Sequence, residues 1–320
     1  VDGDGYGDVV VATPRAPGAA DGGAGDAGVG RFVDVYRGSS KGLAPGSDRP
    51  GSPELPNLGE SVAAAGDVDL DGYGDVLLTS RDGAVIVLGS SLGLGGRMLS
   101  LASAAVYADA PGRVALGGFD LDRDGRSDVI VGSGSRTSPA AAFFRLLASP
   151  SLQYVPLDMR DGLPYEGTAT AAAVLDLDGD GNLDLAFSAP IKPVGEPELS
   201  VLCFLKGPAP AVVPGDCADG SSEFASTIAA ADVDGDGRDD LVFGADQRAL
   251  TSLMNADGVI DFGPSFSVEG VPIVRALTPS RPGPARWLAV TRDAMVVIEG
   301  NKRKTTLAPP AGFRFDAVAQ

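Results

Sequence analysis

One short aspartate-rich pattern, repeated along the chain, constrains this sequence more than any other feature. Each copy reads D-x-D-x-D-G-x-x-D, with aspartates at positions 1, 3, 5 and 9 and glycine at position 6. The copies, numbered here as loops 1 to 5, occupy residues 1–9, 67–75, 120–128, 176–184 and 232–240. Their position-3 aspartates are separated by 67, 53, 56 and 56 residues, and loop 1 lacks the position-1 aspartate. Self-similarity at a period of this length indicates an array of repeated structural units.

The sequence around each copy predicts β-strands. Small residues precede the pattern, as in Ser61-VAAAG, and a β-rich run follows it, as in Asp75-VLLTS. A second apolar run comes next, as in Ala84-VIVLG, and then a weaker one. A solenoid can share this period, but its leucine-rich, ankyrin and armadillo signatures are absent. Four strands per repeat favour an all-β fold, a β-propeller of four-stranded blades.

We interpret residues 1–320 as one propeller domain. The range 271–308 has strand periodicity without the aspartates, and we predict a degenerate sixth blade there. Residues 312–320 resemble the opening strand of a further repeat and could close the ring, which removes exposed sheet edges. The chain therefore holds six blades, and seven are equally plausible if the native chain is longer. Because it opens inside a loop without methionine, we expect it to be part of a longer secreted protein.

The spacing of the aspartates favours calcium. It places carboxylates at positions 1, 3, 5 and 9, a backbone carbonyl at position 7, and a glycine where the chain must turn sharply. Ca²⁺ takes six to eight such oxygens, whereas Zn²⁺ prefers His and Cys, and this chain has no His. An EF-hand would need Glu at position 12 and flanking helices. A single Asp-Gly stretch is often only an Asx turn, but five copies at one spacing favour metal.

The predicted metal residues are Asp2, Asp4, Tyr6 and Asp8 in loop 1; Asp67, Asp69, Asp71, Tyr73 and Asp75 in loop 2; Asp120, Asp122, Asp124, Arg126 and Asp128 in loop 3; Asp176, Asp178, Asp180, Asn182 and Asp184 in loop 4; and Asp232, Asp234, Asp236, Arg238 and Asp240 in loop 5. We expect about four to five Ca²⁺ ions with a structural role, because uncompensated carboxylates in one loop repel one another. The truncated loop 1 should bind most weakly.

The charge supports bound cations over a basic partner. The net charge is −18, yet the aspartates at positions 1, 3, 5 and 9 of the loops account for 19 of the 43 acidic residues, which leaves 24 acidic residues against 25 Lys and Arg. A nucleic-acid partner is disfavoured because it needs a clustered positive surface. No uninterrupted apolar stretch reaches the about 18 residues of a membrane span.

Two further features bear on compartment and chemistry. Cys203 and Cys217 lie 14 residues apart, and of a disulfide and two free thiols we favour the disulfide, which implies an oxidising compartment. The segments Gly38-SSKG and Gly89-SSLG match the G-x-S-x-G pattern of hydrolases. That chemistry needs a His base, so we interpret both as turns and expect that the chain is not an enzyme.

The segment Gly59-ESVAAAGDVDLDGYGDVLLTS resembles the FG-GAP repeat of integrin α-subunit propellers and their bacterial relatives. Leu58 stands where that family has Phe, and Val33-DVYRGSSKGL is similar to the family's following hairpin. The resemblance implies a propeller, usually seven-bladed, with calcium between the first two strands of a blade. It implies an extracellular adhesion or protein-recognition module. Two alternatives stay open: a glycan-binding, lectin-like propeller, and a passive scaffold domain of a larger secreted enzyme.

Overall fold

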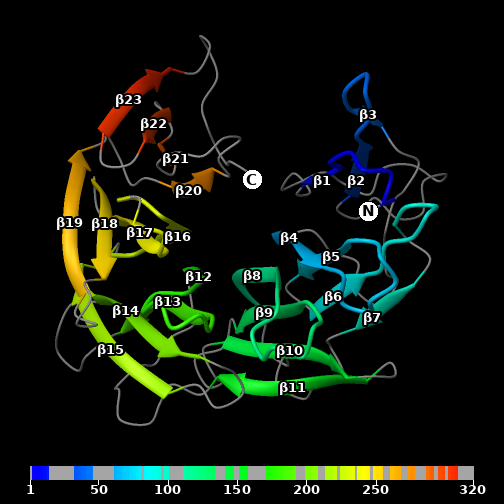
Figure 1. Cartoon of the computed structure of the whole chain (residues 1–320), viewed down its shortest axis with the longest axis horizontal. Helices are drawn as coiled ribbons and strands as arrows, with labels where there is room; N and C mark the ends of the chain where they lie inside the picture. The colour runs from blue at the N-terminus through cyan, green and yellow to red at the C-terminus, as the bar shows by residue number, and fades with distance from the viewer. Residues whose placement is uncertain are drawn as a thin grey trace, which may run out of the picture. The chain divides into compact units, whose positions relative to one another are not determined.

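The fold is all-β. The computed structural model describes residues 2–13, 32–45, 61–80, 83–94, 97–100, 111–133, 141–147, 151–157, 171–191, 199–207, 213–221, 224–234, 236–245, 248–254, 260–267, 273–277, 286–291, 295–299 and 302–308. Within these ranges all regular structure is β-strand, arranged in six small antiparallel sheets (Figure 1). No helix there is long and apolar enough to cross a membrane. The chain divides into two compact units, Val1–Asp161 and Gly162–Gln320.

The first unit contains three sheets. The first has three strands, β1 (Val9–Thr13), β2 (Phe32–Arg37) and β3 (Ala44–Pro45). The second has four strands, β4 (Ser61–Gly66), β5 (Asp75–Ser80), β6 (Gly83–Val87) and β7 (Met98–Ser100). The third has four strands, β8 (Pro111–Phe119), β9 (Asp128–Ser133), β10 (Ala141–Leu147) and β11 (Ser151–Leu157).

The second unit contains three sheets of four strands. The first comprises β12 (Ala171–Leu175), β13 (Asp184–Ile191), β14 (Leu199–Lys206) and β15 (Val213–Gly220). The next comprises β16 (Thr227–Ala231), β17 (Asp240–Ala245), β18 (Arg248–Met254) and β19 (Ile260–Ser267). The last comprises β20 (Ile273–Leu277), β21 (Arg286–Val290), β22 (Met295–Glu299) and β23 (Lys302–Leu307), within the range predicted as a degenerate blade.

Every sheet is an antiparallel meander in which strands consecutive in the sequence pair with one another. Loops 2 to 5 each join the first strand of a sheet to its second, the place that the repeat predicts for them. Loop 1 leads into β1, the first strand of its sheet. The predicted ring-closing strand, 312–320, lies outside the described residues and stays a prediction.

The sheets pack face to face because their strands alternate side chains between two apolar faces. In the second sheet, Val76 and Leu78 of β5 share a buried cluster with Val33 and Val35 of β2. Leu77, between them in the sequence, packs with residues of β9 in the third sheet. The sheets of the second unit share clusters in the same way, with residues of β13 and β17 together in one of them. First strands also lie next to first strands, β4 against β8 and β12 against β16.

One covalent link joins neighbouring strands in the second unit. Cys203 of β14 and Cys217 of β15 are directly opposite in the register and form a disulfide. The predicted pairing is therefore confirmed.

Candidate metal sites

The five loops share one backbone conformation. The glycine at position 6 has a positive φ in every loop, between 81° and 90° in Gly5, Gly72, Gly125, Gly181 and Gly237. Position 4 is also left-handed in loops 1 to 4, even where it is not glycine, as in Leu70 (φ 59°) and Arg123 (φ 61°). Left-handed backbone is strained for residues with a β-carbon, so the loop must supply compensating interactions.

Aspartate side chains supply those interactions by binding backbone N–H groups inside the loop. In loop 3 the Asp120 carboxylate accepts from the N–H groups of Asp124 (3.0 Å) and Gly125 (2.8 Å). The Asp124 carboxylate accepts from the N–H of Arg126 at 2.9 Å. The hydrogen bond from position 7 to position 5 recurs in all the other loops, donated by Tyr6, Tyr73, Asn182 and Arg238. Short aspartate side chains favour such turns because they bind the backbone two residues on.

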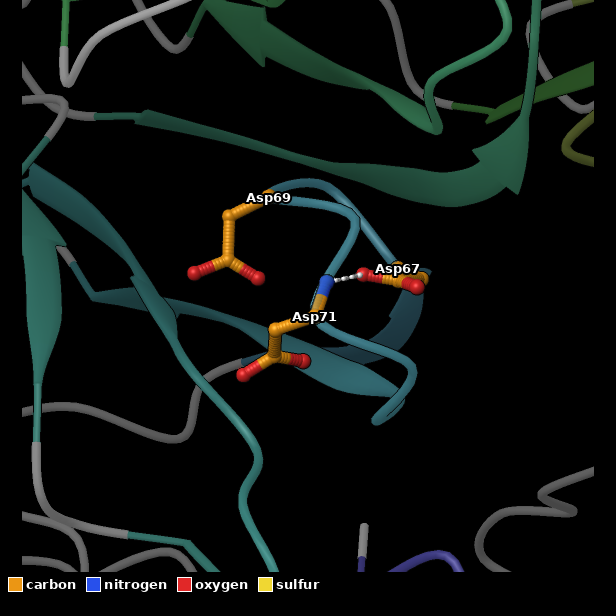
Figure 2. A group of neighbouring side chains, drawn as sticks. All are labelled: Asp67, Asp69 and Asp71. Carbon is orange, nitrogen blue, oxygen red and sulfur yellow. Dashed lines mark hydrogen bonds between the residues drawn. The ribbon is translucent and has the colours of Figure 1, made fainter.

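These turns gather carboxylates at the centre of each complete loop. In four loops, three aspartates each place one carboxylate oxygen within 4.8 Å of the other two. The groups are Asp67, Asp69 and Asp71; Asp120, Asp122 and Asp128; Asp176, Asp178 and Asp184; and Asp232, Asp234 and Asp240. Figure 2 shows the first group, with the hydrogen bond from the Asp71 backbone to Asp67. Such groups could hold metal ions.

The groups differ from the predicted ligand sets at some positions. Asp75 lies outside the group of loop 2, and the position-5 aspartates of loops 3, 4 and 5 lie outside theirs, namely Asp124, Asp180 and Asp236. Among the described residues, the aspartates of the truncated loop 1 form no such group.

The aspartate at position 9 is buried in loops 2 to 5, and in loops 2 and 4 it joins the loop to the next hairpin. One oxygen of Asp75 accepts from the Val68 N–H and the other from the Gly89 N–H, both at 2.8 Å. Asp184 binds Leu177 and Gly207 in the same way, both at 2.9 Å. At Gly207 a side chain would collide with the carbonyl oxygen of Leu183, so glycine permits the close approach.

The third sheet lacks that second donor. By register, Leu146 of β10 occupies the position that Gly89 and Gly207 hold in their sheets, and Met254 occupies it in the sheet of loop 5. Asp128 still accepts from the Leu121 N–H at 2.8 Å, but its Oδ1 is buried without a hydrogen-bond partner. Oδ1 atoms of Asp69 and Asp176 are also buried and without partners. Because buried polar atoms normally have partners, three partnerless carboxylate oxygens in these loops fit a bound cation of the hard, oxygen-seeking class.

Burial disfavours the ionised form of the position-9 carboxylates. It raises the pKa of Asp75 and of Asp240 to about 6 and that of Asp128 to about 7. Backbone hydrogen bonds oppose the rise, and the charges of neighbouring loop aspartates add to it. Burial also raises the pKa of Asp184. A cation bound in the loop would favour the ionised form of these groups.

Three loops contain a protein cation next to the position-3 aspartate. Arg37 lies 3.5 Å from Asp2, Arg97 lies 3.7 Å from Asp69, and Lys206 lies 3.1 Å from Asp178. Sequence reasoning missed these pairs, although Arg37 and Lys206 both directly precede the glycine that binds position 9. These ion pairs are partly exposed, so each contributes little to stability.

Comparison with known families agrees with the repeat. A model described as an FG-GAP-like repeat matches residues 120–187, and one described as an FG-GAP repeat matches residues 224–258. The chain belongs to the FG-GAP repeat family. The two matches contain loops 3, 4 and 5 of this FG-GAP repeat protein. No curated protein matches it.

Matched substitutions at position 9 should distinguish an aspartate whose two oxygens both accept backbone hydrogen bonds, Asp75, from one with a partnerless oxygen, Asp128. In calcium-stripped buffer, Asp75→Asn should cost about 1–3 kcal/mol, because the amide nitrogen cannot accept the second backbone hydrogen bond. Asp128→Asn should cost less or stabilise at pH 8, since its amide nitrogen replaces a partnerless oxygen and a buried charge is removed. Urea unfolding of both variants measures this, and equal losses would contradict it.

The raised pKa values predict how metal-free stability depends on pH. A folded-state pKa above the unfolded value means that the folded chain binds more protons. The contribution of these aspartates is therefore fully present below about pH 4 and is lost as pH rises towards about 7. Urea unfolding at intervals from pH 4.5 to 7.5 in calcium-stripped buffer should show this decline, with a shallower slope for Asp128→Asn. An identical slope in that variant would contradict the assignment.

Proposed function

We propose that this chain is a calcium-stabilised extracellular β-propeller that serves as an adhesion or protein-recognition module. The observation that carries the proposal is the set of four carboxylate groups between first and second strands, with partnerless buried oxygens at Asp69, Asp128 and Asp176. The FG-GAP repeats support the same reading, because repeats of this family resemble those of integrin propellers.

The packing supports a propeller. Four-stranded meanders that pack face to face, with first strands next to first strands, are what blades around an axis require. The proposal keeps six blades for this chain, and seven stay the alternative if the native chain is longer.

In this proposal calcium stabilises the fold by neutralising the loop carboxylates. When bound, the ion supplies positive charge and coordinates oxygens from the aspartates and from the position-7 carbonyl. It offsets the repulsion among the loop carboxylates and the cost of burying position 9. Four complete loops and the truncated loop 1 account for about four to five ions. Affinities of about 10⁻⁴–10⁻³ M, typical of extracellular modules, suit this role outside cells, and the disulfide fits the same compartment.

We also propose that the chain is not itself an enzyme. The two G-x-S-x-G segments form hairpin turns in which the Ser39 and Ser90 hydroxyls donate to the carbonyls of Gly42 and Gly93, at 2.8 and 2.9 Å. The glycan-binding and scaffold alternatives stay predictions from the sequence.

Calcium should raise the melting temperature specifically. Calcium at 100 times the dissociation constant stabilises the folded state by about 2.7 kcal/mol per site. Thermal melts in excess Ca²⁺, in Mg²⁺ alone and in chelator should therefore differ, with the highest temperature in Ca²⁺. The Asp122→Asn variant, which weakens loop 3, should show a smaller calcium shift. Coincident melts would refute calcium stabilisation.

A recognition module should bind its ligand only while its loops are ordered. The immobilised chain should retain a protein from surface extracts of the producing organism in millimolar Ca²⁺ and release it in chelator. Free monosaccharides should not release it, and release by a sugar would instead favour the glycan alternative. A variant with Asp122→Asn and Asp178→Asn should retain less at limiting calcium.

A further inference from the structure

Loop 5 lies directly against loop 4. The side chain of Arg238, at position 7 of loop 5, covers Gly179, at position 4 of loop 4. A β-carbon at Gly179 would lie only 3.0 Å from Cδ of Arg238, and the backbone there is left-handed (φ 72°). Loop 4 therefore accommodates the arginine by having no side chain at this point.

Asp239, at position 8 of loop 5, stands between the two loops. Its carboxylate accepts a backbone hydrogen bond from Asp176 and interacts electrostatically with Asp176 and Asp232. Asp176 and Asp232 are the position-1 aspartates of loops 4 and 5, and both belong to the candidate metal groups. One carboxylate thus experiences the charge of both loops.

The first unit repeats this arrangement. The ring of Tyr73, at position 7 of loop 2, lies against Gly3, at position 4 of loop 1, where a β-carbon would be 2.9 Å from the ring. Ser127, at position 8 of loop 3, donates its N–H to the Asp67 carbonyl at 3.5 Å. Its hydroxyl occupies the space that a side chain at Gly66 would need. In each of the three described pairs, a residue at position 7 or 8 contacts the preceding loop.

Positions 7 and 8 also belong to the metal loop that they come from. The N–H of Arg238 donates to the Asp236 carboxylate at 2.9 Å, and residue 239 directly precedes the buried Asp240. Ordering loop 5 therefore fixes the residues that lie against loop 4, and ordering loop 4 fixes the surface on which they rest. When two sites are coupled in this way, a ligand bound at one site raises the affinity of the other site by the same factor in both directions.

We propose that adjacent loops within a unit bind calcium cooperatively, with the residues at positions 7 and 8 as the coupling residues. The proposal rests on the proposed calcium binding and adds to it. Calcium in either loop orders the contact and reduces the negative charge around Asp239. The second ion then enters a loop whose neighbour is already ordered.

Hydrogen–deuterium exchange of the full chain during a calcium titration can report each loop separately. Peptides covering 176–184 and 232–240 give the calcium midpoints of loops 4 and 5. The double substitution Asp234→Asn/Asp236→Asn disables loop 5 and should raise the midpoint of loop 4 about fivefold or more, the usual range of coupling between sites. Disabling loop 4 with Asp178→Asn/Asp180→Asn should raise the midpoint of loop 5 by the same factor, because coupling is reciprocal.

The coupling residues are tested by repeating the loop 5 knockout in an Arg238→Ala/Asp239→Ala background, where it should no longer shift loop 4. Asn182→Ala is the matched control, because Asn182 also occupies position 7 but its amide donates to Asp180 inside its own loop at 2.8 Å. That variant can change the midpoint of loop 4, yet the knockout should still shift it by the original factor.

Three outcomes would overturn the proposal. If both loops bind calcium but the loop 5 knockout leaves the midpoint of loop 4 unchanged, the loops are independent and the proposed function survives. If the shift persists in the Arg238→Ala/Asp239→Ala background, positions 7 and 8 do not carry the coupling. If no loop peptide responds to calcium in the parent chain, the proposed function fails and the coupling fails with it.

Discussion

The buried carboxylate at position 9 is the interaction on which each repeat depends. In loops 2 and 4 its two oxygens bind the loop's own backbone and the N–H of a glycine that follows the third strand. Three segments of a sheet therefore meet at one side chain. Burying a carboxylate costs free energy, as the raised pKa of Asp75 shows, and backbone hydrogen bonds offset only part of that cost. A cation in the loop would offset the remainder.

The aspartates at positions 1, 3 and 5 help to form the site that such a cation would occupy. Their turns bind backbone N–H groups, hold left-handed residues such as Leu70 and Arg123, and gather carboxylate oxygens. Because carboxylate oxygens carry further lone pairs, an oxygen that accepts an N–H can also face a metal. The backbone hydrogen bonds thus arrange the donors before an ion is present, and the repulsion among the donors remains to be neutralised.

The sequence predicted the parts of this structure that depend on local spacing. Aspartates two residues apart, a glycine at position 6 and alternating apolar runs were enough for the all-β repeats and the place of the loops. Features that depend on pairing between segments were missed. Nothing near Asp128 in the sequence reveals that its Oδ1 lacks the hydrogen bond that Asp75 and Asp184 receive from a glycine N–H. Likewise, Lys206 contacts Asp178 only because β14 returns beside the loop. Blade number and ring closure depend on residues outside the described ranges.

Position 7 shows how one repeat can serve two purposes. The loop needs only backbone atoms there, an N–H for the position-5 carboxylate and, in the proposed calcium site, a carbonyl for the ion. The side chain is therefore unconstrained by the metal, which explains why Tyr, Arg and Asn all occur at this position in one chain. Packing against the preceding repeat then decides the residue: an aromatic ring over Gly3 and a guanidinium over Gly179. Identical metal loops can in this way carry different contacts to their neighbours.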